Sequence, residues 1–189
     1  GNNNLTSYTD GNGHTSAYTY DAKNNLLSTT LAAGGATTYA YNEKGQLVSA
    51  TDAAGHVVRY EYAGANLIRT IDALGNESLF EYDSLGRMIR ATDPLGNKTR
   101  YTYDANGNLV KMTLPNGAET TYAYDALGNR ISSIDPMGNE TKYEYDALSR
   151  LVSTTFADGT KQTAEYDYNG NVVKATDTLG NVTSATYDK

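Results

Sequence analysis

The chain has 189 residues, with 15 Lys and Arg against 22 Asp and Glu, a net charge of -7, and neither Cys nor Trp. An acidic chain is a poor partner for phosphate backbones, so we expect no nucleic-acid partner. The absence of cysteine excludes disulfides and thiolate metal sites. No apolar run approaches the ~20 residues that cross a bilayer, so no membrane span is expected.

The apolar content is low for a folded protein. Leu, Ile, Val and Phe account for 31 residues, which is below the roughly 20% line associated with disorder. The small net charge and the 17 tyrosines oppose disorder, because tyrosine supplies large amphipathic surface. If the chain folds, tyrosine must carry much of its packing.

An internal repeat runs through the whole chain. The second tyrosine of a Tyr-x-Tyr pair recurs at intervals of 21 residues, with one interval of 20. These tyrosines form the second column: Tyr20, Tyr41, Tyr62, Tyr82, Tyr103, Tyr124, Tyr145, Tyr166 and Tyr187. A first column of aromatic residues lies two positions earlier: Tyr18, Tyr39, Tyr60, Phe80, Tyr101, Tyr122 and Tyr143. Ala164 and Ala185 replace the aromatic residue in the last two repeats.

Two glycine columns mark two turns in each repeat. One follows the Tyr-Asp step and includes Gly86, Gly107 and Gly128, with Asn24 and Ser149 in place of glycine in two repeats. The other runs from Gly13 to Gly180 and includes two Asp-Pro-x-Gly sequences that are typical of tight turns. Because glycine adopts a positive φ at little cost, we expect Gly107 and Gly128 to have φ above zero.

Segments of strand length lie between these turns. From Asn97 to Asp104, tyrosines alternate with charged or polar residues, which places both tyrosines on one face of a strand. The other segment, exemplified by Leu47 to Thr51, has apolar residues on both faces. No segment has helical periodicity. The sequence therefore predicts an all-β fold: a repetitive antiparallel hairpin ribbon of about nine repeats with two strands each. A flat sheet of this width would twist and curl, so the ribbon must coil, close or pack against something.

The pattern resembles the RHS or YD repeat. The residues that carry the resemblance are Tyr103-Asp104-Ala105-Asn106-Gly107-Asn108-Leu109 and the longer stretch from Tyr82 to Gly96. The resemblance implies a β-hairpin ribbon that spirals into a hollow shell, as in bacterial RHS proteins and Tc-toxin-type shells that enclose a toxic C-terminal segment, or in the extracellular barrel of teneurins. Three features depart from the pattern: the short Tyr62-Ala63-Gly64 turn, Arg130 at an apolar position, and Ala164 with Ala185.

The titratable residues favour structural roles over catalytic ones. His14 and His56 each follow a turn glycine, 42 residues apart, which favours surface turn positions over a metal pair. Asp104 and Asp125 precede turn glycines, which favours hydrogen bonds to turn amides over acid–base chemistry. The Asp104 to Asn108 segment vaguely resembles a calcium loop, but it lacks the distal Glu of an EF-hand. We therefore expect no enzyme activity, no metal and no cofactor.

Four of the five Asn-x-Ser/Thr motifs, at Asn76, Asn97, Asn139 and Asn181, occupy one repeat position. The repeat explains them without glycosylation. The residues expected to maintain the repeat are the six tyrosines, stacked between neighbouring repeats and mostly buried, together with turn residues: Tyr101, Tyr103, Tyr122, Tyr124, Tyr143, Tyr145, Gly86, Gly107, Gly128, Asp104 and Asp125. The aromatic face could alternatively bind carbohydrate.

Residues 1–189 are expected to form a single repeat array without a second domain, as part of a longer chain or an assembly. The leading hypothesis is a wall of a shell that encloses a toxin or other cargo. The alternative is an extracellular fibre or surface adhesin assembled by end-to-end strand pairing. The expected partners are neighbouring repeats, or identical subunits through edge strands near residues 5–9 and 182–187, and toxin cargo. Both hypotheses imply a secreted or cell-surface location.

Overall fold

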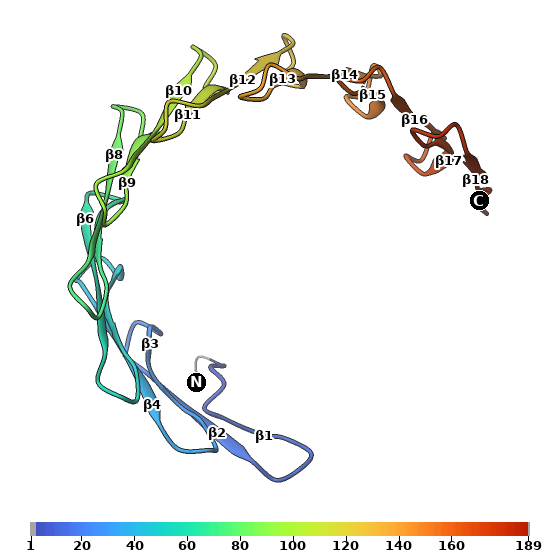
Figure 1. Cartoon of the computed structure of the whole chain (residues 1–189). Helices are drawn as coiled ribbons and strands as arrows, with labels where there is room; N and C mark the ends of the chain where they lie inside the picture. The colour runs from blue at the N-terminus through green and yellow to red at the C-terminus, as the bar shows by residue number, and fades with distance from the viewer. Residues whose placement is uncertain (1–2, 189) are drawn as a thin grey trace. The chain divides into compact units, whose positions relative to one another are not determined.

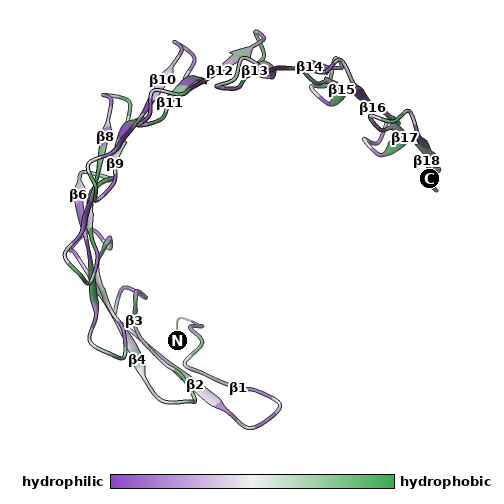
Figure 2. Ribbon diagram, in the orientation of Figure 1, coloured by the Kyte–Doolittle hydropathy of each residue, from purple (hydrophilic) through white to green (hydrophobic). Residues whose placement is uncertain are grey.

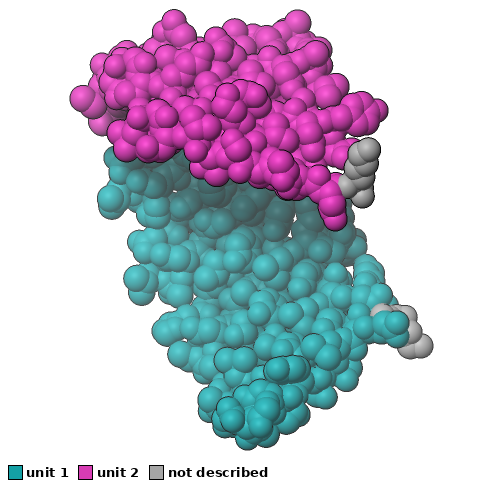
Figure 3. All heavy atoms as spheres, turned by 90° about the vertical axis from the view of Figure 1, so that its right-hand side faces the viewer, with its two compact units in different colours: residues 1–98 teal, residues 99–189 magenta. Residues whose placement is uncertain are grey.

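A computed structural model describes residues 3–188 of the chain. These residues form strands and turns and contain no helix, hence none that could cross a membrane. The chain falls into two compact units, residues 1–98 and 99–189 (Figure 3). Both units are built from the same repeat of paired strands.

Unit 1 contains nine strands, most of which are labelled in Figure 1. They are β1 (Ser7–Thr9), β2 (Thr15–Tyr20), β3 (Leu26–Thr30), β4 (Ala36–Tyr41), β5 (Leu47–Thr51), β6 (Val57–Ala63), β7 (Asn66–Ile71), β8 (Glu77–Tyr82) and β9 (Met88–Thr92). Each strand pairs antiparallel with the next along the chain, from β1 to β9. The expected all-β hairpin ribbon is confirmed.

Unit 2 repeats the arrangement with another nine strands. They are β10 (Lys98–Tyr103), β11 (Leu109–Thr113), β12 (Glu119–Tyr124), β13 (Arg130–Ile134), β14 (Glu140–Tyr145), β15 (Leu151–Thr155), β16 (Lys161–Tyr166), β17 (Val172–Thr176) and β18 (Val182–Ser184). Again each strand from β10 to β18 pairs antiparallel with its successor. Its strand bounds follow the segments predicted from the repeat.

The register of the strands places the aromatic columns on one face. In β10 the side chains alternate between exposed and half-buried, with Tyr101 and Tyr103 on the half-buried face and Arg100 on the exposed one. Across the sheet, Tyr101 lies opposite Met112, and Tyr122 lies opposite Ser133. We call this side of each unit the tyrosine face and the other side the charged face.

An irregularity recurs wherever the second column meets the next strand. The register shifts by one residue between Ala123 and Tyr124, so that Tyr124 pairs with Arg130 instead of the residue beside it. The same shift occurs in the other hairpins closed by a Tyr-Asp turn, and in the β4–β5 hairpin, where Asn42 replaces the aspartate. Such bulges increase the local twist and re-aim the side chain next to them.

Each unit is a single-layered sheet without an enclosed apolar core. Among the described residues no apolar side chain is fully buried, and the most buried residue is Ser153, at 4% exposure. All six expected tyrosines are half-buried. Figure 2 shows polar and apolar residues interspersed along the strands. The expectation that these tyrosines are mostly buried is therefore met only in part: the rings cover one face, and nothing in the described chain closes over them.

The irregular repeat at Tyr62 has a local structural explanation. Strands β6 and β7 are joined by only two residues, Gly64 and Ala65, with Ala63 paired to Asn66. Gly64 has a φ of 64°, which a two-residue hairpin loop requires. The repeat is thus shortened in the turn, and the strands on either side keep their pairing.

Candidate functional site

The second-column tyrosines join neighbouring strands through their hydroxyl groups. The Tyr124 hydroxyl donates a hydrogen bond of 2.9 Å to the carbonyl of Leu109, 15 residues earlier, at the start of β11. The same bond recurs for Tyr20, Tyr41, Tyr82, Tyr145, Tyr166 and Tyr187, at 2.9–3.1 Å. Each of these rings therefore lies across the preceding strand or, for Tyr20, across the segment just before β1, and satisfies a backbone carbonyl there. Partial burial raises the pKa of Tyr41 and Tyr124.

A first-column ring is well defined at Tyr143. Its hydroxyl lies 3.3 Å from the hydroxyl of Ser133, which places the ring over the preceding strand, β13. Arg130, the departure from the apolar pattern, sets its guanidinium 4.7 Å from the centre of this ring and 5.7 Å from that of Tyr122. Arginine can replace leucine here because its planar group packs against aromatic faces.

The Tyr-Asp turns are organised by their aspartates. Asp125 Oδ1 accepts hydrogen bonds from the amides of Leu127 and Asn129, and Oδ2 accepts one from the Asn129 side chain, all at 2.9 Å. Asp104 is held in the same way by Asn106 and Asn108. These donors, the asparagine side chain first, hold the pKa of both carboxyls below its ordinary value. Both carboxylate oxygens accept hydrogen bonds within the turn. The Asp and Asn residues that resemble a calcium loop are therefore explained by their hydrogen bonds to one another and to the turn amides.

The turn glycines have the expected backbone. Gly86, Gly107 and Gly128 have φ values of 79°, 92° and 84°. The amide of Gly128 donates to the carbonyl of Asp125 at 3.1 Å, which closes the turn. This geometry corresponds to the three-residue hairpin loop whose last residue is left-handed. Asn24 and Ser149 adopt the same conformation, with φ values of 69° and 60°, so the prediction for this column is confirmed.

The residue after the turn glycine completes the second set of turns. The side chains of Asn76, Asn97, Asn139 and Asn181 each donate to the aspartate four residues earlier, at 2.7–2.8 Å. This role explains why four Asn-x-Ser/Thr motifs share one repeat position. His14 and His56 occupy the same position and contact Asp10 and Asp52 through Nδ1, at 3.1 and 2.8 Å. Within residues 3–188 no cluster of three or more His, Asp and Glu side chains is arranged to hold a metal.

The charged face is lined with ion pairs between adjacent strands. Examples are Lys174 with Glu165, at 2.8 Å, and Arg90 with Glu81. Arg69 lies between Glu77 and Glu61. Its hydrogen bonds to these two carboxylates, the bond to Glu77 first, raise the pKa of the guanidinium. Exposed pairs of this kind contribute about 0–1 kcal/mol each, so they favour register and solubility more than stability.

Some contacts could not be anticipated from the sequence. The hydroxyl-to-carbonyl bonds depend on the direction in which each ring leans, which alternation does not specify. Arg150 is a second case: its guanidinium contacts Asp146 of its own turn, the carbonyl of Asp167 in the next Tyr-Asp turn at 2.8 Å, and the Tyr166 ring at 4.8 Å. The sequence signal for this contact is an arginine directly after the left-handed turn residue, a position shared by Arg87, where most other repeats carry asparagine.

Comparisons with known proteins agree with this geometry. The family model described as the RHS repeat matches residues 1–37, 20–57, 41–77, 60–98, 82–119, 103–136 and 124–161. No curated protein matches the chain.

Similar solved structures include a Tc holotoxin pore of Photorhabdus luminescens, with 19% identity, a TM-score of 0.56, and coverage of 92% of this chain and 12% of that one. The complex of TcdB2 and TccC3 gives the same four values. A TcdB2–TccC3 structure without its hypervariable C-terminal region has 19% identity and a TM-score of 0.58, with coverage of 86% of this chain and 11% of that one.

The chain thus spans about an eighth of the length of the solved chains that it resembles. At this identity the likeness establishes the fold alone. The family model, by contrast, matches in seven overlapping segments that together cover residues 1–161. With its paired tyrosines, aspartate turns and left-handed glycines, the chain belongs to the RHS repeat family.

Proposed function

We propose that this array forms part of the wall of an RHS-type shell that encloses a toxin or other cargo, and that its role is structural, without enzymatic activity. The observation that carries the proposal is the single-layered sheet: nine strands in each unit, without an enclosed apolar core. A sheet of this kind has two large faces, as a wall requires. The similar structures come from Tc toxin assemblies, and TcdB2–TccC3 has a hypervariable C-terminal region.

Exposed apolar side chains at the turn tips support a place within a larger assembly. Leu95 and Met137 are 87% and 86% exposed at the tips of their Asp-Pro turns, and Leu85 and Leu127 are each 75% exposed at Tyr-Asp turns. Large exposed apolar groups are typical of surfaces that another segment covers. In a shell, further repeats of the same protein would cover them. A protein with this role would act in a secreted or cell-surface toxin system.

The proposal is tested in the full-length protein that contains this array. We expect particles with a hollow interior in electron micrographs, and a segment beyond the array that resists added protease while the particle is intact. Tyr124→Ala should open the wall and make that segment digestible, whereas Ala123→Ser, a change at an exposed neighbour, should not. Digestion of the segment at the same rate in intact particles and in isolation would contradict enclosure.

The second candidate is a fibre or adhesin built by strand pairing. It is favoured by the exposure of every residue in β1 and β18. Because Ala185 donates to the carbonyl of Val173, Ser184 belongs to a pair of residues that is not hydrogen bonded, and its amide points away from β17. Such outward amides template further pairing.

Ser184→Pro removes this outward amide without removing a bond to β17, and Ser184→Ala is the matched control. A fibre predicts a sedimentation coefficient that rises with protein concentration in the wild type and in the alanine variant but stays constant in the proline variant. A monomer at every concentration would exclude end-to-end assembly of this chain.

A further inference from the structure

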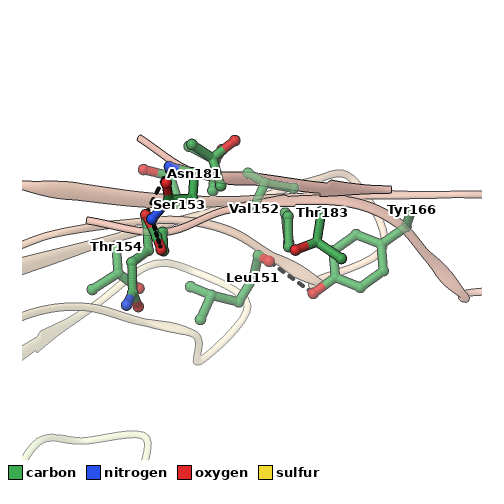
Figure 4. Close-up of a pocket in the computed structure, with 13 residues that line it drawn as sticks. Leu151, Val152, Ser153, Thr154, Tyr166, Asn181 and Thr183 are labelled. Carbon is green, nitrogen blue, oxygen red and sulfur yellow. Dashed lines mark hydrogen bonds between the residues drawn. The ribbon is translucent and has the colours of Figure 1, made fainter. Parts of the chain in front are cut away.

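An open hollow lies on the tyrosine face of unit 2, over strands β15 to β18. Its volume is about 330 Å³, and its lining includes Val152, Thr154, Gln162, Ala164, Ala175 and Thr183. At one end of the hollow, the hydroxyl of Tyr166 donates a hydrogen bond of 2.9 Å to the carbonyl of Leu151 (Figure 4). None of the roles described above uses this hollow.

The hollow coincides with the interruption of the first aromatic column. Ala164 and Ala185 stand where seven earlier repeats carry Tyr or Phe. The strand register is unaffected, because Ala164 pairs with Ala175 as Tyr122 pairs with Ser133. The backbone of the site is thus that of a complete repeat, and only the ring is missing.

The complete repeat shows where the missing ring would lie. The Tyr143 ring crosses from β14 to β13, with its hydroxyl 3.3 Å from Ser133 Oγ. One repeat later, Ala164 takes the place of Tyr143 and Thr154 the place of Ser133. A ring at the corresponding position would cover Val152 and direct its hydroxyl toward the hydroxyl of Thr154, both of which line the hollow.

We propose that the hollow binds the side chain of a tyrosine presented by a partner polypeptide, which completes the interrupted aromatic column. Apolar and polar groups are placed for a phenol: Val152, Ala164 and Ala175 contact the ring, and Thr154 exchanges a hydrogen bond with its hydroxyl. The same chain places a tyrosine ring in the equivalent position of neighbouring repeats, which argues for tyrosine over other occupants. This inference does not depend on enclosure of a cargo.

The first test uses p-cresol, the analogue of the tyrosine side chain, and N-acetyltyrosinamide as probes of the 189-residue chain. In nuclear magnetic resonance titrations, we expect saturable shifts confined to Val152, Thr154, Ala164, Ala175 and Thr183. Toluene, which lacks the hydroxyl, should bind at least about threefold more weakly, because it leaves Thr154 without a hydrogen-bond partner. Equal binding of toluene, or tighter binding of glucose, would overturn the assignment to a tyrosine.

The second test fills the hollow from within. Ala164→Tyr should abolish the p-cresol shifts, whereas Ala123→Tyr, on the charged face of a complete repeat, should leave them unchanged. Thr154→Val keeps the shape of the site and should remove the preference for p-cresol over toluene, which provides a test even if Ala164→Tyr does not fold. Wild-type p-cresol binding by folded Ala164→Tyr, or unchanged selectivity in Thr154→Val, would overturn the proposal. Shifts that do not saturate would do the same.

Discussion

The repeats around β12–β14 and around β16–β18 differ in one aromatic column and agree in the other. In the former, Tyr122 and Tyr143 occupy the first column, and Arg130 packs against both rings. In the latter, that column is reduced to alanine. Even so, Tyr166 and Tyr187 keep their hydroxyl bonds to the carbonyls of Leu151 and Val172, at 2.9 and 3.1 Å.

The difference separates two tasks that the repeat combines. Strand order is maintained by the turns, the backbone pairing of the strands and the second-column tyrosines. All three persist where the first column is absent. The first-column rings cover the tyrosine face, since the register is intact where Ala164 replaces a ring and an open hollow lies over that position. Substitutions in the two columns should therefore have different consequences, and the predictions below address that contrast.

The largest effect is expected from Tyr124→Ala. This substitution removes a half-buried ring and its bond to Leu109, and we expect a loss of about 3 kcal/mol in the free energy of unfolding. Tyr122→Ala should cost about 1 kcal/mol, as for a cross-strand pair, because the β16–β18 repeat tolerates alanine there. Chemical denaturation of both variants measures the difference. Equal losses would show that the two columns do not have separate roles.

The next effect concerns the turn backbone. Gly128→Val forces a branched side chain into a left-handed conformation and should destabilise the protein by about 1–2 kcal/mol. Ser149→Gly, at the same turn position in the following repeat, should instead raise the melting temperature. Thermal unfolding followed by circular dichroism distinguishes the two. A tolerated valine would mean that this turn can change its geometry.

Removal of a single hydroxyl should have a smaller effect. Tyr124→Phe keeps the ring and leaves the Leu109 carbonyl without its donor, for a loss of about 1 kcal/mol. Tyr166→Phe should give a similar loss, although its repeat lacks the first aromatic ring. The comparison uses unfolding free energies from denaturant titrations. If only the Tyr124 variant loses stability, the second-column bond depends on the first column after all.

The smallest effect expected is a dependence of the protein's stability on pH. Because hydrogen bonds from Asn129 lower the folded-state pKa of Asp125, this carboxylate stabilises the protein above its ordinary pKa. That stabilisation is lost as the pH falls through the lower, folded-state value.

Asp125→Asn should make the melting temperature less sensitive to pH in this acidic range. Asn42 shows that an asparagine can fill the role, since its Oδ1 accepts from the amides of Lys44 and Gln46 at 3.0 Å. Melting curves from pH 2 to pH 6 provide the measurement. An identical pH profile for wild type and variant would assign the acid sensitivity to other groups.

The sequence alone was sufficient to predict the strands, the turns and the two faces of the sheet. Period-two alternation places Tyr101 and Tyr103 on one face, and glycine at a turn position indicates a positive φ, as Gly107 confirms. Alternation does not say which neighbouring strand a ring covers, so the bond from Tyr124 to Leu109 could not be predicted. Nor does composition reveal whether a tyrosine face has a second layer over it, so the burial of the tyrosines was overestimated.

The pairing of each strand with its successor has a consequence for folding. Any strand pair within a unit closes through a short loop, such as Asp125 to Asn129, and requires no contact with a distant segment. Topologies rich in local contacts fold quickly, and in repeat proteins each repeat is stabilised mainly by its neighbours. Each hairpin can therefore form on the edge left by the previous one, and ordered structure can grow from one end while the rest of the polypeptide is still unfolded.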